Sequence, residues 1–182
     1  MRFYLFESQI NEHKILDLLN ALKQANGPQG VYVNSPGGTF EFFSQLGPAI
    51  ERRGIVTLSG DVRSAAVILA LLGNRRYALP DSTFFFHEVR TIVNESQQVT
   101  LYDLDEFLEY EHYMSGKMRE GIQEWRRQML VAQNWFLRYL SERTGVAIGT
   151  LLNLMRSEAT LTAHDALRYG IIHEILPCIP ME

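Results

Sequence analysis

The sequence predicts an α/β fold in which a largely parallel sheet is covered by helices. Short β-rich segments alternate with helix-like segments over about the first 90 residues, and glycine or proline marks most of the boundaries. This alternation is typical of parallel strands joined by right-handed crossover helices. The composition then changes: residues 104–142 are rich in Glu, Gln, Arg, Met and aromatic side chains and contain no proline. That segment predicts one or two long helices.

The first helix has the clearest periodicity. A strand is predicted at Arg2–Glu7 and an amphipathic helix at Asn11–Ala25, which ends at the dipeptide Gly27-Pro28. The apolar side chains of this helix recur at i, i+3, i+4 and i+7, and they are Ile15, Leu18, Leu19 and Leu22. We expect this face to lie on the sheet.

The same reasoning places the remaining elements of the first half of the chain. In order, they are a strand at Gly30–Asn34, a turn at Ser35–Gly38, a helix at Phe40–Arg52, a strand at Gly54–Leu58, a polar turn at Ser59–Arg63, a helix that starts at Ser64 and ends at Gly73-Asn74, and strands at Arg76–Leu79 and Thr83–His87. The last two strands are predicted to be separate because Pro80-Asp81 lies between them.

In the second half, Thr91–Leu101 is predicted as a polar loop and Leu104–Glu142 as helix, with an interruption near Ser115-Gly116. Two short helices and a last strand follow, at 145–155, 162–169 and 171–176. The long helix carries an apolar stripe, made of Leu130, Phe136, Leu137 and Leu140. We expect one domain over 1–182 with an enlarged helical region at about 91–142, whose stripe needs a partner surface.

Composition excludes several classes of function. The net charge of −4 gives no general affinity for nucleic acid, and the apolar run Ala65–Leu72 is far too short to cross a bilayer. The single cysteine, Cys178, permits no internal disulfide, so a cytoplasmic location is expected. No metal-ligand cluster, phosphate loop or dinucleotide motif is present, and no cofactor is expected.

Three polar segments follow predicted strands, where functional groups of α/β proteins gather. They are Asn34–Gly38, Gly60–Ser64 and the strand end at His87. A serine at a strand-to-helix turn can be a nucleophile beside oxyanion-binding N–H groups, and a nearby histidine can take its proton. Taken singly, Ser64 is as readily a helix cap, and His87 a core or surface histidine.

The order of these segments resembles the Clp protease proteolytic subunit family of self-compartmentalised serine peptidases. The resemblance rests on VNSPGGTF, on GDVRSAAVILALLGNRRYALPDSTFFFHE and on TLTAHDALRYGIIHEIL, which occur in the family's order over nearly the whole chain. It implies a crotonase-like ββα superhelix with a projecting handle helix. It also implies a serine endopeptidase that acts on peptides or unfolded proteins as a homo-oligomeric ring.

Residue by residue, the resemblance implies that Ser64 is the nucleophile and His87 the general base. The backbone N–H groups of Gly38 and Ala65 correspond to the family's oxyanion hole. The position of the family's catalytic aspartate falls on Glu158, and a glutamate can orient a histidine as an aspartate does. If Glu158 is not the acid, Asp165 or Glu88 come next, or the pair works without one.

The chain departs from the family at several points. Asp61 and Arg63 place charges before the serine, and His87 is followed by Glu88-Val89-Arg90 where the family continues with a glycine-rich substrate strand. The family's axial loop has no counterpart before Arg2, so an ATPase unfoldase partner is not favoured. These departures favour one alternative, an inactive Clp-like scaffold or interaction protein, whereas the retained Ser64 and His87 oppose it. A crotonase-type acyl-CoA enzyme shares the fold, but its chemistry needs no Ser-His pair, so that pair argues against it.

Overall fold

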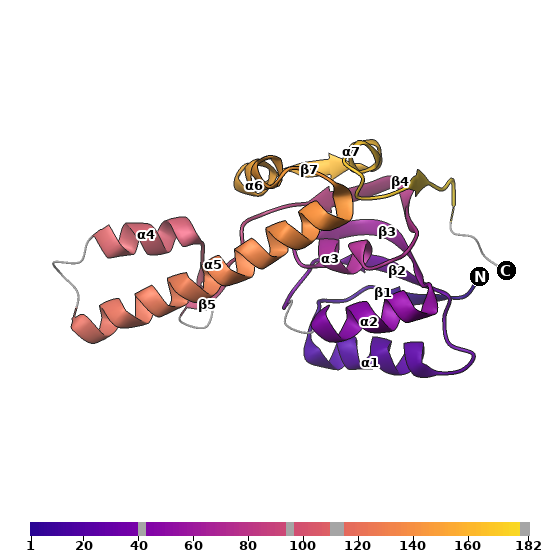
Figure 1. The fold of residues 1–182 in the computed structure, drawn as a ribbon, viewed down its shortest axis with the longest axis horizontal. Coiled ribbons are helices and arrows are strands. Elements are labelled where there is room, and N and C mark those ends of the chain that lie inside the picture. The colour runs from indigo at the N-terminus through magenta and orange to yellow at the C-terminus, as the bar shows by residue number, and fades with distance from the viewer. Residues whose placement is uncertain (40–42, 94–96, 110–114, 179–182) are drawn as a thin grey trace.

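A mixed β-sheet with helices around it forms the body of the molecule, and a pair of helices projects from it as an arm (Figure 1). The computed structural model describes residues 1–39, 43–93, 97–109 and 115–178. In the described residues the main sheet has the strand order β1-β2-β3-β4-β7, with β8 also paired to β4. The pairs β1–β2, β2–β3 and β3–β4 are parallel, and β7 is antiparallel to β4. The α/β fold with a largely parallel sheet is therefore confirmed.

The strands and helices occur along the chain in nearly the predicted order. The strands are β1 (Phe3–Phe6), β2 (Gly30–Ser35), β3 (Val56–Arg63), β4 (Arg76–Phe85), β5 (Thr91–Val93), β6 (Gln97–Val99), β7 (Thr160–Thr162) and β8 (Glu174–Ile175). The helices are α1 (Glu12–Lys23), α2 (Phe43–Arg53), α3 (Ala66–Leu71), α4 (Leu101–Glu109), α5 (Gly116–Thr144), α6 (Ile148–Arg156) and α7 (Ala163–Arg168). The predicted start of α2 at residues 40–42 lies outside the described residues.

Local side-chain caps explain where several helices begin. Asn11 accepts a hydrogen bond from the N–H of Lys14 at the start of α1, and Ser115 accepts one from Met118 at the start of α5. Thr162 and Asp165 form a reciprocal capping box on α7. The four periodic side chains of α1 are buried, as their spacing predicts.

The polar turn predicted at Ser59–Arg63 is wrong, because β3 continues through it. This segment pairs with β2 on one side and β4 on the other, and Ser59 is only 1% exposed. Hydrogen bonds along both edges keep a strand extended even where its side chains are small and polar.

The break predicted at Pro80-Asp81 is also wrong, because β4 is one strand with a bulge at that point. Ser59 pairs with Ala78 and Asp61 with Thr83, so β4 has extra residues opposite β3. The hydroxyl of Ser82 accepts from the N–H of Leu79 and donates to the carbonyl of Ser59. The side chain of Ser82 therefore connects β4 to β3 at the bulge, where backbone pairing is interrupted.

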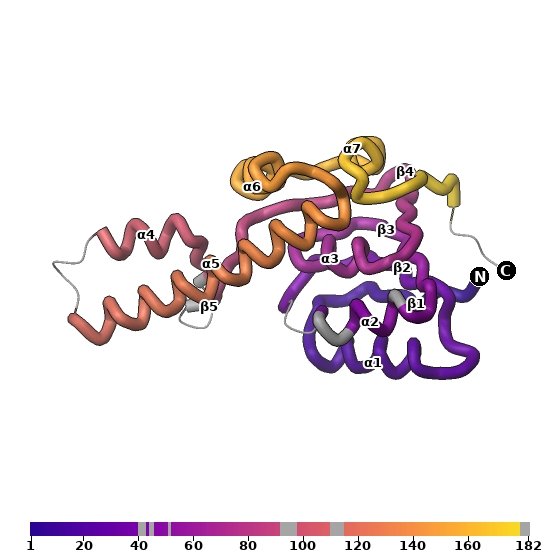
Figure 2. The backbone as a smooth tube through the Cα atoms, in the orientation of Figure 1, coloured from indigo at the N-terminus to yellow at the C-terminus, as the bar shows by residue number. Residues whose placement is uncertain are grey.

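One further prediction, at the root of the arm, is wrong. The segment expected as a loop at Thr91–Leu101 contains the antiparallel pair β5–β6, and α4 already begins at Leu101. Two helices separated before Ser115 are confirmed, as α4 and α5. Figure 2 follows the chain from β4 into the arm and back along α5 to the body.

Candidate active site

Ser64 lies at the point where β3 turns into α3. Its φ of 55° is in the left-handed region, which costs a residue with a Cβ about 1 kcal/mol. Its N–H donates to the carbonyl of Phe85 at 3.0 Å, so the turn is tied to the end of β4. The N-cap of α3 is Ala65, without a side-chain cap hydrogen bond. Ser64 is therefore not the helix cap that its sequence position allows.

Two glycines bring the loop after β2 against this turn. A Cβ on Gly37 would lie 2.6 Å from the carbonyl oxygen of Arg63 and 2.8 Å from the Cβ of Ser64. A Cβ on Gly38 would lie 2.2 Å from the carbonyl oxygen of Ile10. Both glycines also have positive φ, 93° and 143°. No other residue type allows this close approach without a shift of the backbone.

The N–H of Gly38 is turned away from the neighbouring strand-like segment. Ile10 donates to the carbonyl of Gly37 at 2.7 Å and accepts from the N–H of Thr39 at 3.1 Å. Successive N–H groups of extended backbone point to opposite sides, so the N–H of Gly38 faces away from Ile10. Neither this N–H nor that of Ala65 has an acceptor within the described part of the chain. Two backbone donors are therefore available to a ligand oxygen.

His87 follows β4, and its ring makes one short hydrogen bond. Nδ1 lies 2.6 Å from the carbonyl oxygen of Glu88. A carbonyl only accepts, so Nδ1 carries the proton and Nε2 is the basic nitrogen of the neutral ring. Burial lowers the pKa of His87 most, the bond to Glu88 raises it, Arg90 lowers it, and Glu158 raises it. The net shift is downward, which keeps the imidazole neutral and able to act as a base at neutral pH.

Four of the five predicted site residues line one open cleft of about 750 Å³: Gly38, Ser64, Ala65 and His87. Loops after β1, β2, β3 and β4 all reach it, which matches the gathering of functional groups at the carboxyl ends of parallel strands. Across the described residues no hydrogen bond joins Ser64 to His87. The cleft therefore holds both groups without a hydrogen bond between them.

Glu158 lies outside this cleft and has a different partner. It sits between α6 and β7 with a φ of 50°, and its carboxylate forms an ion pair with the guanidinium of Arg90. Its influence on His87 is the weakest of the four that shift the pKa of the ring. Asp165 belongs to the capping box of α7, and Oε1 of Glu88 lies 3.5 Å from Nε of Arg156. The structure does not bring any of these three carboxylates into contact with the imidazole.

Several residues that line the cleft were not predicted from the sequence. Gln9 follows β1, so the rule that strand ends gather at one edge could have found it. Phe136 comes from α5, and no local pattern indicates that this helix reaches the cleft. Arg63, noted as a charge beside the serine, pairs instead with Asp61 at the surface.

The described residues offer neither a metal site nor a membrane-spanning helix. Among residues 1–39, 43–93, 97–109 and 115–178, no group of three His, Cys, Asp or Glu side chains is placed to hold a metal ion. In the same ranges, no helix has the length and apolar character needed to cross a membrane.

Comparison with known proteins shows a distant similarity to a protease subunit. No protein-family model matches the sequence. The chain is 26% identical over 152 residues to the ATP-dependent Clp protease proteolytic subunit 1 of Thermobifida fusca (strain YX). The chain is similar to a Clp protease subunit. The aligned part covers 81% of this chain and 59% of that relative, so the chain spans about three fifths of the relative's length. This similarity indicates a distant relationship to a protease family.

Proposed function

We propose that this chain is a serine peptidase of the Clp type, in which Ser64 is the nucleophile and His87 the general base. The observation that carries the proposal is the composition of the cleft. A serine at a left-handed turn, two backbone N–H groups without acceptors and a histidine with a basic Nε2 all line it. The distant similarity to a Clp protease subunit supports peptides as the substrate class.

The proposed reaction uses these groups in two steps. Oγ of Ser64 attacks the scissile carbonyl carbon while Nε2 of His87 takes the hydroxyl proton. The negative oxygen that forms is stabilised by the N–H groups of Gly38 and Ala65. His87 then returns the proton to the departing amine, and the same steps with water release the acyl group. Ser64 and His87 must first move into hydrogen-bond contact, a tightening that substrate binding commonly produces.

Glu158 is the acid that the resemblance to the family implies, and its charge favours a protonated His87. Its carboxylate is engaged by Arg90, so a direct bond to the ring requires that this ion pair opens.

A peptidase assay tests the proposal. Ser64→Ala should reduce hydrolysis of a fluorogenic peptide by about 10⁴-fold or more, because the nucleophile is lost. Thr150→Ala, which removes an exposed hydroxyl of α6, is the matched control and should retain parental activity. If parent and Ser64→Ala hydrolyse the peptide at the same rate, Ser64 is not the nucleophile.

A second candidate, an inactive Clp-like scaffold, is favoured by two specific observations. No hydrogen bond joins Ser64 to His87 among the described residues, and Glu158 is paired with Arg90. A scaffold would show no turnover of peptides, yet would still form the assembly proposed next.

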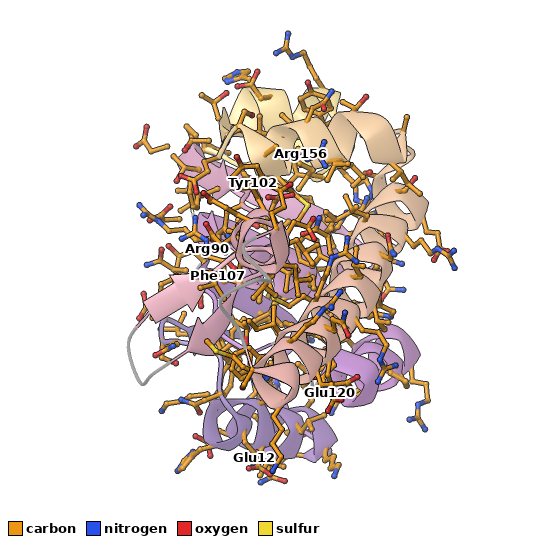
Figure 3. All side chains as sticks on the ribbon, turned by 90° about the vertical axis from the view of Figure 1, so that its left-hand side faces the viewer. Glu12, Arg90, Tyr102, Phe107, Glu120 and Arg156 are labelled. Atoms are coloured by element: carbon orange, nitrogen blue, oxygen red, sulfur yellow. The ribbon has the colours of Figure 1, made fainter. Side chains whose placement is uncertain are left out.

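We also propose that the chain assembles into a ring through its arm. Large apolar side chains are exposed there, among them Tyr102 at 72%, Met118 at 57% and Val131 at 63%. In Figure 3, which faces the end of the arm, Tyr102 and Phe107 are labelled on α4. Exposed apolar groups that gather on one projection are typical of association surfaces.

A further inference from the structure

Gln133 is a buried polar side chain that the proposed reaction does not use. It lies on α5 and is only 6% exposed, one helical turn before Phe136, which lines the cleft. Its amide oxygen accepts from the N–H of Val89 at 3.2 Å. Its amide nitrogen lies 3.4 Å from Oε1 of Glu88, to which it donates. Both bonds reach the two residues that directly follow His87.

These contacts fix the peptide between Glu88 and Val89. The N–H of that peptide is held by Gln133, and its C=O belongs to Glu88, the acceptor of the Nδ1 proton of His87. A peptide unit is planar, so a bond that fixes its N–H also fixes the direction of its C=O. Gln133 is thus linked to the imidazole through one rigid peptide.

The orientation that results is the one a general base requires. In serine hydrolases an acidic side chain usually accepts the Nδ1 proton and leaves Nε2 basic. In this chain a carbonyl oxygen occupies that position at 2.6 Å, while the carboxylate of Glu158 is paired with Arg90. A carbonyl carries only a partial charge, so it selects the tautomer but stabilises the imidazolium less than a carboxylate does.

We propose that Gln133 is a positioning residue of this site: through the Glu88–Val89 peptide it holds the His87 ring with Nδ1 protonated and Nε2 basic. The proposal rests on the proposed function for its catalytic meaning, although the tautomer it assigns can be measured without any activity. Gln133 is not among the residues that line the cleft, and it acts through the peptide that it fixes.

The direct test is ¹⁵N NMR of the histidine ring nitrogens, with the His87 signals assigned by their loss in His87→Gln. The parent should show His87 with a protonated Nδ1 at neutral pH. Gln133→Met keeps a side chain of similar length but removes both hydrogen bonds, and it should shift His87 toward the Nε2-protonated tautomer. Gln128→Met, an exposed glutamine of the same helix that contacts Glu124, is the control and should leave the tautomer unchanged.

A kinetic measurement completes the test. Gln133→Met should slow the reaction of Ser64 with a fluorophosphonate by about 10- to 100-fold, by analogy with the loss of a hydrogen-bond partner that orients a metal-binding histidine. A parent protein whose His87 is protonated at Nε2 overturns the proposal without any variant. An unchanged tautomer in folded Gln133→Met overturns it as well. If the parent fails to react with fluorophosphonate but shows the Gln133-dependent tautomer, the positioning role stands and the peptidase function fails.

Discussion

The two halves of α5 lie in different surroundings, although they belong to one uninterrupted helix. Toward the C-terminus its apolar side chains Phe136, Leu137 and Leu140 join the main core beneath the sheet. Toward the N-terminus, Ile122 and Met129 belong to a second, smaller cluster with Val99, Leu101 and Leu104. The first cluster contains most of the buried apolar residues of the body, whereas the second contains only side chains of the arm and its root. One helix thus connects a large core to a small one.

This difference changes the meaning of the apolar stripe predicted on α5. The stripe was expected to need a partner surface, but Leu137 is 4% exposed and Leu140 fully buried against the chain's own body. The most exposed apolar side chains of α5 lie nearer its N-terminus: Met118 is 57%, Trp125 41% and Val131 63% exposed. Periodicity shows that a helix has an apolar face, but it does not show whether the same chain or another covers that face.

The largest effect is expected in the main core. Leu140→Ala should lower the free energy of unfolding of the whole molecule by about 2–5 kcal/mol, because a fully buried leucine leaves a cavity. Urea denaturation followed by circular dichroism measures this loss. A change below about 0.5 kcal/mol would show that α5 does not share the core of the body.

A smaller and more local effect is expected in the arm. Leu104 is 1% exposed within the second cluster, so Leu104→Ala should loosen α4 and the first half of α5. Hydrogen exchange should show faster exchange in α4 while β3 and β4 keep the protection of the parent. Equal loss of protection in the sheet would contradict the division of the molecule into two cores.

A substitution on the surface of the arm should change the stability of the fold still less. Trp125→Ser removes an exposed ring and should change the free energy of unfolding by no more than about 0.5 kcal/mol. If the arm is the association surface, the same variant should weaken self-association, measured by sedimentation at equal concentrations of parent and variant. Association equal to that of the parent would place the interface elsewhere.

The smallest effect is expected from substitutions in the ion pair between Arg90, at the root of the arm, and Glu158, in the body. The charge of Arg90 lowers the pKa of His87 and that of Glu158 raises it. Since only neutral His87 accepts a proton, the acid limb of the rate profile follows this pKa. Arg90→Gln should therefore move the acid limb to higher pH, and Glu158→Gln should move it to lower pH.

Fluorophosphonate reaction rates between roughly pH 5 and 8 measure both shifts, because histidine titrates in that range. Shifts of the same sign in the two variants would show that the ion pair does not set the charge around His87. The parental profile should have its midpoint below the ordinary histidine pKa of 6.5.

The order of strands and helices was predictable from the sequence, because it depends on local patterns. Four of the residues that line the cleft were predictable as well, because they follow the ends of neighbouring strands. Prediction from the sequence failed where pairing across the sheet decides the outcome. Ser59–Arg63 is polar enough for a turn, yet two neighbouring strands keep it extended. The bulge at Pro80 depends on Ser82 reaching Ser59, a contact between residues 23 apart.

The surroundings of the histidine were beyond prediction for the same reason. Gln133 contacts the peptide that follows His87, and Phe136 lines the cleft. Both lie more than forty residues further along the chain, and no local pattern encodes that approach. Glu158 was predicted from the resemblance to the family alone, and its ion pair joins it to Arg90, a residue 68 positions earlier in the chain.

If Ser64 is a nucleophile activated by His87, a reagent that acylates or phosphonylates active serines should label it covalently. A fluorophosphonate should add its mass once per chain, on the peptide that contains Ser64. Ser64→Ala should take up no label, and His87→Gln should react far more slowly because the base is lost. Label found on another residue, or equal labelling of the parent and Ser64→Ala, would contradict the account.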